Sequence, residues 1–232
     1  MLRFDTVLFD ADNTLFDFDR AEAEVLRQVT EDLGVPLTEE LRRAYGQINT
    51  ALWNRFDRGE ITRDWLVVER FRQYLDLLGG GDPEEMNRAY LKGLGQCSML
   101  LPGAEALCRR LKPFCHMAIL TNGITESQTG RLERSAIQDC IEGLFISQAM
   151  GCQKPQREFF VQVYNALGLT GRDLSRTVMV GDNLQSDILG GQNGGISTIW
   201  FNPHRKKNDS GIHPDWTAET LAEVGDIILA PV

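Results

Sequence analysis

Asp10 and Asp12 are two acids whose type and spacing could do chemistry. They stand two positions apart directly after the apolar run Thr6–Phe9. Beyond the end of a strand, acids at this spacing can both face one pocket. Their mutual repulsion is tolerable if a hard dication lies between them and a further acid, and Mg²⁺ prefers oxygen ligands of this kind. The pair therefore indicates a candidate site for a divalent metal.

Further polar groups follow later apolar runs or stand ahead of later helices. Each is ambiguous alone, because a Thr or Gly-Asp after a strand is often part of a turn or a cap, and a Lys before Pro often only opens a helix. Four such pieces in this order are hard to explain as independent coincidences. The four pieces are Asp10-Ala11-Asp12, Thr121-Asn122-Gly123, Lys154-Pro155, and Gly181-Asp182 with Ser186-Asp187 shortly after it.

Phosphoryl transfer is a chemistry that uses all of these groups. Attack by a carboxylate on a phosphate gives an aspartyl-phosphate, which splits one difficult displacement into two easier ones. A second carboxylic acid can protonate the leaving alkoxide and then deprotonate the water that hydrolyses the intermediate. A lysine and a hydroxyl supply charge and hydrogen bonds to the transferring oxygens. The residues therefore favour a metal-dependent enzyme that hydrolyses a small phosphate monoester.

Short apolar runs predict the strands that position these residues. Each run is continuously apolar, as a strand covered by helices on both faces requires. Residues 144–147 form a weaker fifth candidate. Because ligands of such sheets sit at the carboxyl ends of the strands, the polar groups should share one rim. The four clear runs are residues 6–9, 117–120, 177–180 and 197–201.

Helical patterns lie between the later strands, and this alternation predicts an α/β fold with an open, doubly wound parallel sheet of the Rossmann-like kind. Thr125-Glu126-Ser127-Gln128 has the spacing of a capping box and should open a helix that runs to about residue 137. The other helices are expected at residues 155–167, before Gly168, and at residues 184–192.

Residues 18–96 break this rhythm, because they contain helical patterns and no strand pattern. So long a stretch exceeds a single crossover between strands. We therefore expect an all-helical domain at 18–96, inserted into an α/β domain formed by 1–17 and 97–232. Its helices should cover about 19–33, 38–56 and 62–78, and a fourth should begin at Asp82-Pro83-Glu84-Glu85, an N-cap followed by Pro.

Composition argues against several other classes of function. The apolar content of 42% and charged content of 25% are ordinary for a soluble globular protein. A net charge of -9 repels nucleic-acid polymers and anionic membranes, so we expect neither as a partner. An anionic substrate then needs a local cation. The chain shows no signal-peptide pattern and no apolar stretch near the roughly 20 residues of a membrane helix.

The five cysteines also point to a reducing compartment. Their number is odd and they form no C-x-x-C pair, so reduced and mostly buried thiols are expected. Together with the missing signal peptide, this predicts a cytoplasmic protein.

The motifs, taken together in this order, resemble those of the haloacid dehalogenase superfamily of phosphohydrolases over essentially the whole chain. The helical insertion between the first and second motifs matches the helical-cap type of that family. The motifs are Phe9-Asp10-Ala11-Asp12-Asn13-Thr14-Leu15, Leu120-Thr121-Asn122-Gly123, Lys154-Pro155 and Gly181-Asp182-Asn183-Leu184-Gln185-Ser186-Asp187-Ile188.

This resemblance implies roles for individual residues. Asp10 would be the nucleophile and Asp12 the general acid/base. Thr121 would hydrogen-bond the phosphoryl group, and Lys154 would stabilise the charge of the nucleophile and the phosphate. The implied substrate-binding residues are Thr121, Asn122, Gly123 and Lys154.

The resemblance also implies a ligand set for Mg²⁺. The metal would be held by the Asp10 carboxylate, the Asp12 backbone carbonyl and Asp182, with Asp187 close by or acting through water. Asn13 stands where many relatives carry Gly, so the turn after Asp12 must be accessible to a residue with a side chain. Asn tolerates positive φ better than most residues.

Within the superfamily, several stretches are similar to bacterial pyrimidine 5'-nucleotidases that act on standard and noncanonical nucleoside monophosphates. This similarity implies substrates such as UMP, dUMP and dTMP, with the cap selecting the leaving group. Trp53 and Phe56 in the expected cap could stack on a base, although helix packing explains both. The similar stretches are residues 10–16, 101–104, 121–123, 128–134 and 186–191.

Other functions remain open at this point. A phosphatase or mutase acting on a sugar phosphate would share the same core. A haloacid dehalogenase proper does not need the second acid, so Asp12 argues against that reaction. A phosphonate hydrolase needs a Schiff-base lysine in its cap, where Lys92 is the only lysine and stands near the last boundary. A non-catalytic binding protein would be expected to lose Asp10, Lys154 or Asp182.

Overall fold

The computed structural model describes residues 2–231, apart from the side chain of Asp57. Two compact units are present, and each is described by itself. Unit 1 comprises Met1–Phe18 and Ser98–Val232, and unit 2 comprises Asp19–Cys97. Unit 1 mixes strands and helices, whereas the secondary structure of unit 2 is entirely helical.

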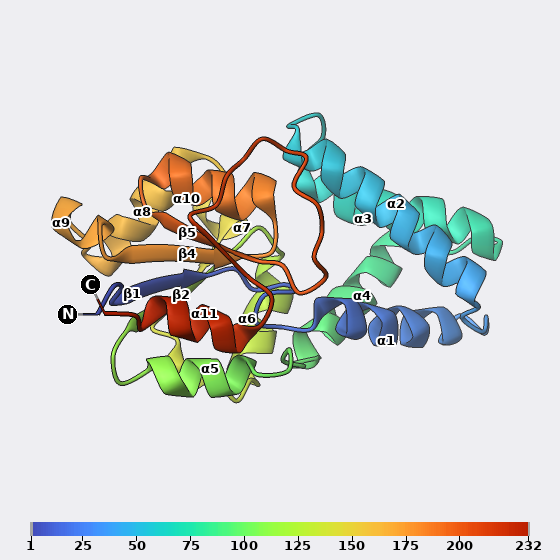
Figure 1. Cartoon of the computed structure of the whole chain (residues 1–232). Helices are drawn as coiled ribbons and strands as arrows, with labels where there is room; N and C mark the ends of the chain where they lie inside the picture. Colours follow the sequence, from blue (N-terminus) through green and yellow to red (C-terminus); the bar gives the residue numbers. More distant parts are fainter. Residues whose placement is uncertain (1, 232) are drawn as a thin grey trace. The chain divides into compact units, whose positions relative to one another are not determined.

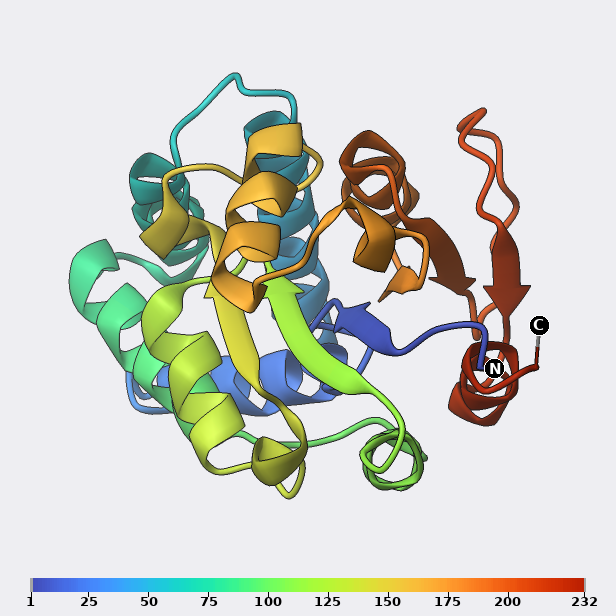
Figure 2. The ribbon, with the colours of Figure 1, turned by 90° about the vertical axis from the view of Figure 1, so that its left-hand side faces the viewer.

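Unit 1 is built on a parallel sheet of six strands in the order β3-β2-β1-β4-β5-β6. Figure 2 shows this order from yellow β3 at one edge to red-brown β6 at the other. The order reverses beside β1, because β2 pairs on one side of it and β4 on the other. The expected doubly wound parallel sheet is confirmed. The strands are β1 (Thr6–Phe9), β2 (His116–Thr121), β3 (Gly143–Ile146), β4 (Thr177–Gly181), β5 (Ser197–Phe201) and β6 (Trp216–Ala218).

Helices of unit 1 alternate with the strands from β1 to β5, which is the basis of a doubly wound sheet. A further helix, α11 (Leu221–Ile228), follows β6. The helices in the connections are α5 (Ala104–Leu111), α6 (Thr125–Glu133), the 3₁₀ turn η1 (Gln138–Cys140), α7 (Ser147–Met150), α8 (Arg157–Leu167), α9 (Gly171–Leu174), the π-helix η2 (Leu184–Ile188) and α10 (Leu189–Gly194).

Helices cover both faces of the sheet, with α8 and α10 on one side and α5 and α11 on the other (Figure 1). Side chains of a strand alternate between faces. Val7 accordingly packs in the cluster that contains Leu107 of α5 and Val224 of α11, whereas Leu8 packs with Phe160 of α8. Burial on both faces explains why the strands are continuously apolar in sequence.

Unit 2 contains four helices: α1 (Phe18–Glu31), which begins at the last residue of unit 1, α2 (Glu39–Asp57), α3 (Arg63–Leu78) and α4 (Pro83–Gln96). Thr38, Thr62 and Asp82 cap the last three by accepting backbone N–H groups. Gly79 ends α3 in the left-handed conformation, with φ of 95°. The expected four-helix pattern, including the Asp82-Pro83 start, is confirmed.

Some sequence-based predictions of local structure are wrong. Thr125 does not cap α6. Ile124 is the N-cap and makes no side-chain cap bond, and the Thr125 N–H donates to the side chain of Gln148 at 2.9 Å. The helix ends at Glu133 instead of near 137, since the chain turns at Ser135. Ser147 opens α7 instead of ending β3.

The last part of the chain adds elements that the sequence did not reveal. Strand β6 has three residues, and α11 follows it and covers the sheet. The ends of the described chain meet here (Figure 2), where the Arg3 N–H donates to the Ala230 carbonyl at 2.9 Å. Of the cysteines, Cys108, Cys115 and Cys140 are buried, and all five are free thiols, as predicted. No helix among residues 2–231 is both long and apolar enough to span a membrane.

Candidate active site

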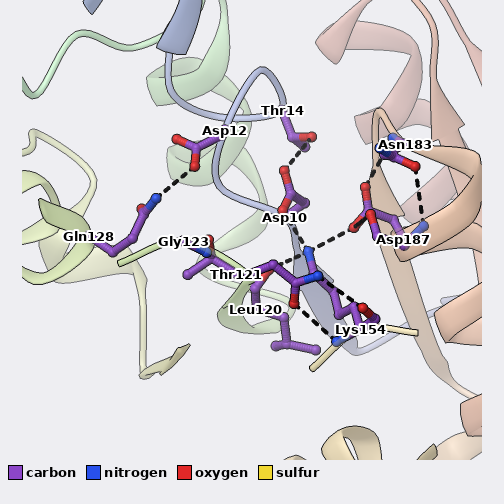
Figure 3. Close-up of polar contacts among 12 residues, drawn as sticks. Asp10, Asp12, Thr14, Leu120, Thr121, Gly123, Gln128, Lys154, Asn183 and Asp187 are labelled. Atoms are coloured by element: carbon purple, nitrogen blue, oxygen red, sulfur yellow. Dashed lines mark hydrogen bonds and ion pairs between the residues drawn. The ribbon is translucent and has the colours of Figure 1, made fainter. Parts of the chain in front are cut away.

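Lys154 lies at the centre of a buried polar cluster at the carboxyl ends of the strands (Figure 3). Its ammonium group donates to Asp10 Oδ1 at 2.6 Å, to Asp187 Oδ1 at 2.7 Å and to the Leu120 carbonyl at 2.7 Å. An ammonium has three donors, and all of them are used. Burial by itself would lower the pKa of Lys154, but Asp10 and Asp187 reverse this and raise it well above its ordinary value. Lys154 is therefore fixed as a cation.

Asp10 directly follows the central strand β1. Its N–H donates to the Val180 carbonyl at 2.8 Å, which continues the pairing of β1 with β4. Its second carboxylate oxygen, Oδ2, accepts a longer hydrogen bond of 3.3 Å from the Thr14 hydroxyl. Burial raises the pKa of Asp10 well above its usual range, although Lys154 works in the opposite direction. The carboxylate is held at both oxygens.

Asp182 and Asp187 complete a cluster of acids around Asp10. One carboxylate oxygen from each of the three lies within 4.8 Å of the others. Burial, and next the charge of Asp187, raises the pKa of Asp182 to about 7. Three carboxylates against one ammonium leave an excess of negative charge, and an all-oxygen donor set suits a hard dication. The residues present therefore fit a divalent metal, which Asp10, Asp182 and Asp187 could hold.

The turn after β4 explains how Asp187 reaches this cluster. A Cβ on Gly181 would lie 2.2 Å from Asp187 Oδ2, so only glycine leaves room for the carboxylate. The Asn183 N–H donates to the same oxygen at 3.0 Å, and the Asn183 side chain caps η2 by accepting two N–H groups. The π-helix turns Asp187 back toward Gly181. Such π-bulges are frequent at functional sites.

The Thr121-Asn122-Gly123 motif begins at the last residue of β2 and contacts the same cluster through Lys154. Asn122 accepts from the Lys154 N–H at 3.0 Å and donates to the Lys154 carbonyl at 2.9 Å. The Thr121 hydroxyl oxygen accepts from the Gly123 N–H at 3.0 Å. The sequence grouped Asn122 with substrate-binding residues, but its side chain is engaged by the Lys154 backbone, which it holds in place.

Asp12 is turned away from Lys154 (Figure 3) and makes a separate pair of contacts. Gln128 Nε2 donates to its Oδ2 at 2.6 Å, and Arg131 Nη1 donates to its Oδ1. Asn13 has φ of 60°, as its position in the motif requires. The sequence did not assign roles to Gln128 and Arg131. Their spacing of three residues, which places them on one helix face, was the available signal.

Trp53 and Phe56 lie on α2 of unit 2, where they pack edge to face with ring centroids 5.5 Å apart. Phe56 is buried, and the Arg63 guanidinium lies 4.9 Å from the centre of its ring. These contacts are those of helix packing. Lys92 is exposed on α4.

A hollow of about 410 Å³ lies at the other end of the strands, beside the amino ends of β1 and β2. Asp5, Thr6, His116 and Glu142 are among its lining residues, and His116 Nδ1 is 2.9 Å from the Glu142 carboxylate. None of the motif residues lines it. The chemistry-bearing groups are instead gathered around Lys154.

Comparison with known proteins agrees with this arrangement. The family model of the haloacid dehalogenase-like hydrolases matches residues 4–195. The chain is 34% identical to the pyrimidine 5'-nucleotidase YjjG of Escherichia coli, over 98% of this chain and 99% of that protein. It is also 34% identical to the pyrimidine 5'-nucleotidase PynA of Streptococcus pneumoniae, over 96% of this chain and 94% of PynA.

A solved structure is similar over nearly the whole chain. It is that of the HAD-hydrolase YfnB from Bacillus subtilis bound to magnesium, which matches with a TM-score of 0.91 and 35% identity. The match covers 97% of this chain and 99% of the YfnB chain. The resemblance stated from the motifs is thereby confirmed: this chain is an enzyme of the haloacid dehalogenase-like hydrolase family.

Proposed function

We propose that this chain is a Mg²⁺-dependent phosphomonoester hydrolase that acts through an aspartyl-phosphate on Asp10. The observation that carries the proposal is the buried contact between Asp10 and Lys154, beside Asp182 and Asp187. A carboxylate fixed next to a permanent cation, at the switch point of a doubly wound sheet, is suited to attack an anionic phosphate.

In this mechanism Lys154 and Thr14 hold the two oxygens of Asp10, so the nucleophile enters the reaction in a fixed orientation. Lys154 also offsets the repulsion between the carboxylate and the incoming phosphate. The Thr121 hydroxyl oxygen already accepts a hydrogen bond from Gly123, which leaves its O–H available to donate to a phosphoryl oxygen. These groups bind and orient the phosphate.

Mg²⁺ would be held by the carboxylates of Asp10, Asp182 and Asp187 with the Asp12 backbone carbonyl. When bound, it would neutralise charge on the substrate phosphate. The relative YfnB has been solved with magnesium, which supports this choice of metal. The proximity of three carboxyl groups, with the pKa of Asp182 raised to about 7 by burial and by Asp187, supports it independently, because a bound dication would offset both effects.

Asp12 is the proposed general acid/base. It would protonate the leaving oxygen as the bond to phosphorus breaks and then take a proton from the water that hydrolyses the aspartyl-phosphate. The nucleophile and the acid/base group must be separate side chains, because the first becomes phosphorylated. Lys154 holds Asp10, while Gln128 and Arg131 hold Asp12.

The proposed substrates are pyrimidine nucleoside 5'-monophosphates, such as UMP, dUMP and dTMP, with noncanonical analogues. The full-length similarity to YjjG and PynA supports this choice. Unit 2 is the proposed cap that selects the leaving group. The sequence places this cap at residues 18–96. The acidic charge of the chain makes a small substrate suitable and a nucleic-acid polymer unsuitable.

Phosphate release from a panel of nucleoside monophosphates and sugar phosphates tests the proposal. Each reaction is run with Mg²⁺ and with excess chelator. The expected result is metal-dependent release that favours the pyrimidine nucleotides. Preference for sugar phosphates would keep the chemistry and overturn the nucleotide assignment, and a lack of release from every compound would overturn both.

A further inference from the structure

We propose that Gln128 and Arg131 are positioning residues that hold the Asp12 carboxylate by both of its oxygens and thereby set the rate of leaving-group departure. This inference rests on the proposed function, in which Asp12 supplies a proton to the leaving group. It assigns work to two residues of α6 that lie outside the four motifs and whose side chains hydrogen-bond to Asp12 instead of Asp10 or Lys154.

The two donors bind different oxygens of the Asp12 carboxylate. Gln128 Nε2 donates to Oδ2 at 2.6 Å, while Arg131 Nη1 donates to Oδ1. A carboxylate held at one oxygen can still rotate, whereas donors at both oxygens fix the plane of the group. Both donors come from one face of α6, since residues three positions apart on a helix are neighbours.

Arg131 is buried to a degree unusual for a charged side chain. It is 0% exposed, and among the described residues its ion pair is with Asp12 alone. Burying an unpaired charge is costly, so the guanidinium and the Asp12 carboxylate depend on each other. This burial makes Arg131 a rigid support with little freedom to follow a moving carboxylate.

The rest of the guanidinium is held by an aromatic ring. Its carbon lies 4.6 Å from the ring centre of Phe16, and Nε and Nη2 find no hydrogen-bond partner among residues 2–231. A cation over a ring face is attracted to it, which partly compensates for those unmade hydrogen bonds. The stacking leaves Nη1 as the donor that reaches Asp12. The contact with the Asp12 carboxylate accounts for a buried arginine at this position.

Gly123 provides the space for the second donor. A Cβ at this position would lie 2.4 Å from Gln128 Nε2 and 2.9 Å from Gln128 Cγ. A larger residue would therefore push the Gln128 side chain off Asp12. Gly123 thus leaves room for the Gln128 side chain that binds Asp12. Asn122 binds the backbone of Lys154, and Thr121 is the proposed phosphate-binding residue.

A positioning role predicts a dependence on the leaving group. Departure of a nucleoside alkoxide needs a proton, whereas p-nitrophenolate leaves as a stable anion. Because kcat/KM reports steps only up to the first irreversible one, for p-nitrophenyl phosphate it excludes the later hydrolysis of the aspartyl-phosphate. Misplacing Asp12 should therefore lower kcat/KM for a nucleoside monophosphate and spare kcat/KM for p-nitrophenyl phosphate.

The test measures both kcat/KM values for Arg131→Met and Gln128→Leu. For Arg131→Met we expect a loss on the order of 10²-fold with dUMP, as general acid catalysis contributes about that much, and a change of less than about threefold with p-nitrophenyl phosphate. Gln128→Leu, which removes no charge, should show the same pattern with a smaller loss. It keeps the test available if Arg131→Met does not fold.

Two further variants complete the design. Arg134→Met removes an exposed arginine that follows α6 and should leave both values unchanged. In a background of Asp12→Ala, Arg131→Met should cause no additional loss with dUMP. Equal losses with the two substrates, or wild-type values in both α6 variants, would overturn the inference alone. If the wild-type enzyme hydrolysed neither substrate, the proposed function would be overturned, and this inference with it.

Discussion

At the scale of single residues, the candidate site depends on one cation. Lys154 uses its three donors on Asp10, Asp187 and the Leu120 carbonyl, and its backbone is held on both sides by Asn122. A lysine held in this way is a fixed charge and not a proton carrier, because its pKa is raised well above its ordinary value by the two acids.

Lys154→Met should remove this charge while keeping a long apolar side chain. Turnover with Mg²⁺ should fall by about 10³-fold, since a preorganised charge on the transferring phosphate is lost. The variant should also melt at a lower temperature, because breaking a buried ion pair costs about 3–5 kcal/mol. Steady-state rates and thermal melts check both effects. Lys112→Met, which alters an exposed lysine, is the control, and turnover of Lys154→Met within tenfold of wild type would contradict the proposed role.

Asp182 allows a test that does not require turnover. Its pKa is raised to about 7, first by burial and then by Asp187, so the folded chain binds this proton more tightly than the unfolded chain does. The folded state therefore loses stability as the pH rises from about 4 through 7. The Asp182→Asn variant does not lose this stability, because an amide side chain does not ionise. Measured with chelator, its melting temperature should exceed that of wild type at pH 8, and the difference should shrink toward pH 5.

The same variant tests the metal site. Added Mg²⁺ should raise the melting temperature of the wild-type protein and have little effect on Asp182→Asn, because a ligand that binds only the folded state stabilises it. An equal rise in both proteins would exclude Asp182 as a ligand. A difference between the two proteins that does not vary with pH would contradict the account of its pKa.

At the scale of elements, short connections after the strands bring the acids together. The clearest case is the turn from β4 into η2, where Gly181 lets the Asp187 carboxylate lie against the backbone. Gly181→Ala would place a Cβ 2.2 Å from Asp187 Oδ2 and force the carboxylate away from Lys154 and Asp10. A displacement of about 1 Å in a catalytic site can cost on the order of 10²-fold in rate.

We therefore expect Gly181→Ala to reduce turnover by about 10²-fold and to require more Mg²⁺ for half-maximal rate. A magnesium titration of the rate measures both effects. Gly171→Ala is the matched control, because no atom lies within 4 Å of a Cβ at that position. A wild-type magnesium dependence in Gly181→Ala would show that the close approach of Asp187 is dispensable.

Much of this framework could be predicted from the sequence. Strands β1, β2, β4 and β5 are continuously apolar because both faces of the sheet are covered, and polar motifs stand at the carboxyl ends of β1, β2 and β4. Strand β6 was missed because three residues at a sheet edge carry too little pattern. Helix α6 begins at Thr125 as predicted, but its capping box was predicted wrongly, because the Thr125 N–H is bound by Gln148, which is distant in sequence.

The pairing inside the site was harder to predict. Which acid meets Lys154 and which meets Arg131 depends on side chains more than 100 residues apart along the chain. Their position after one strand predicted that Asp10 and Asp12 share a pocket. In the structure the two side chains have different partners, since Asp10 binds Lys154 and Asp12 binds residues of α6. The structural role of Asn122 toward the Lys154 backbone was likewise invisible, since a motif does not say which atoms its side chains engage.

At the scale of the whole molecule, the site described here belongs to unit 1 alone. The two segments of unit 1 that flank unit 2 in the sequence pair with each other, as the Asp17 N–H donates to the Met99 carbonyl at 3.0 Å and the Leu101 N–H to the Leu15 carbonyl at 2.9 Å. Unit 1 can thus keep its site ordered while carrying a long insertion. Chemistry in unit 1 and selection by unit 2 is the division of labour proposed for this chain.

The central claim is that Asp10 carries the phosphoryl group. The most direct measurement is to quench the enzyme during turnover of dUMP with Mg²⁺, reduce it with borohydride, and sequence the peptide that contains residues 10 and 12 by mass spectrometry. Borohydride converts an aspartyl-phosphate to homoserine. The account predicts homoserine at position 10 and unmodified Asp12, and no conversion in Asp10→Asn. Homoserine at position 12, or none during active turnover, would contradict it.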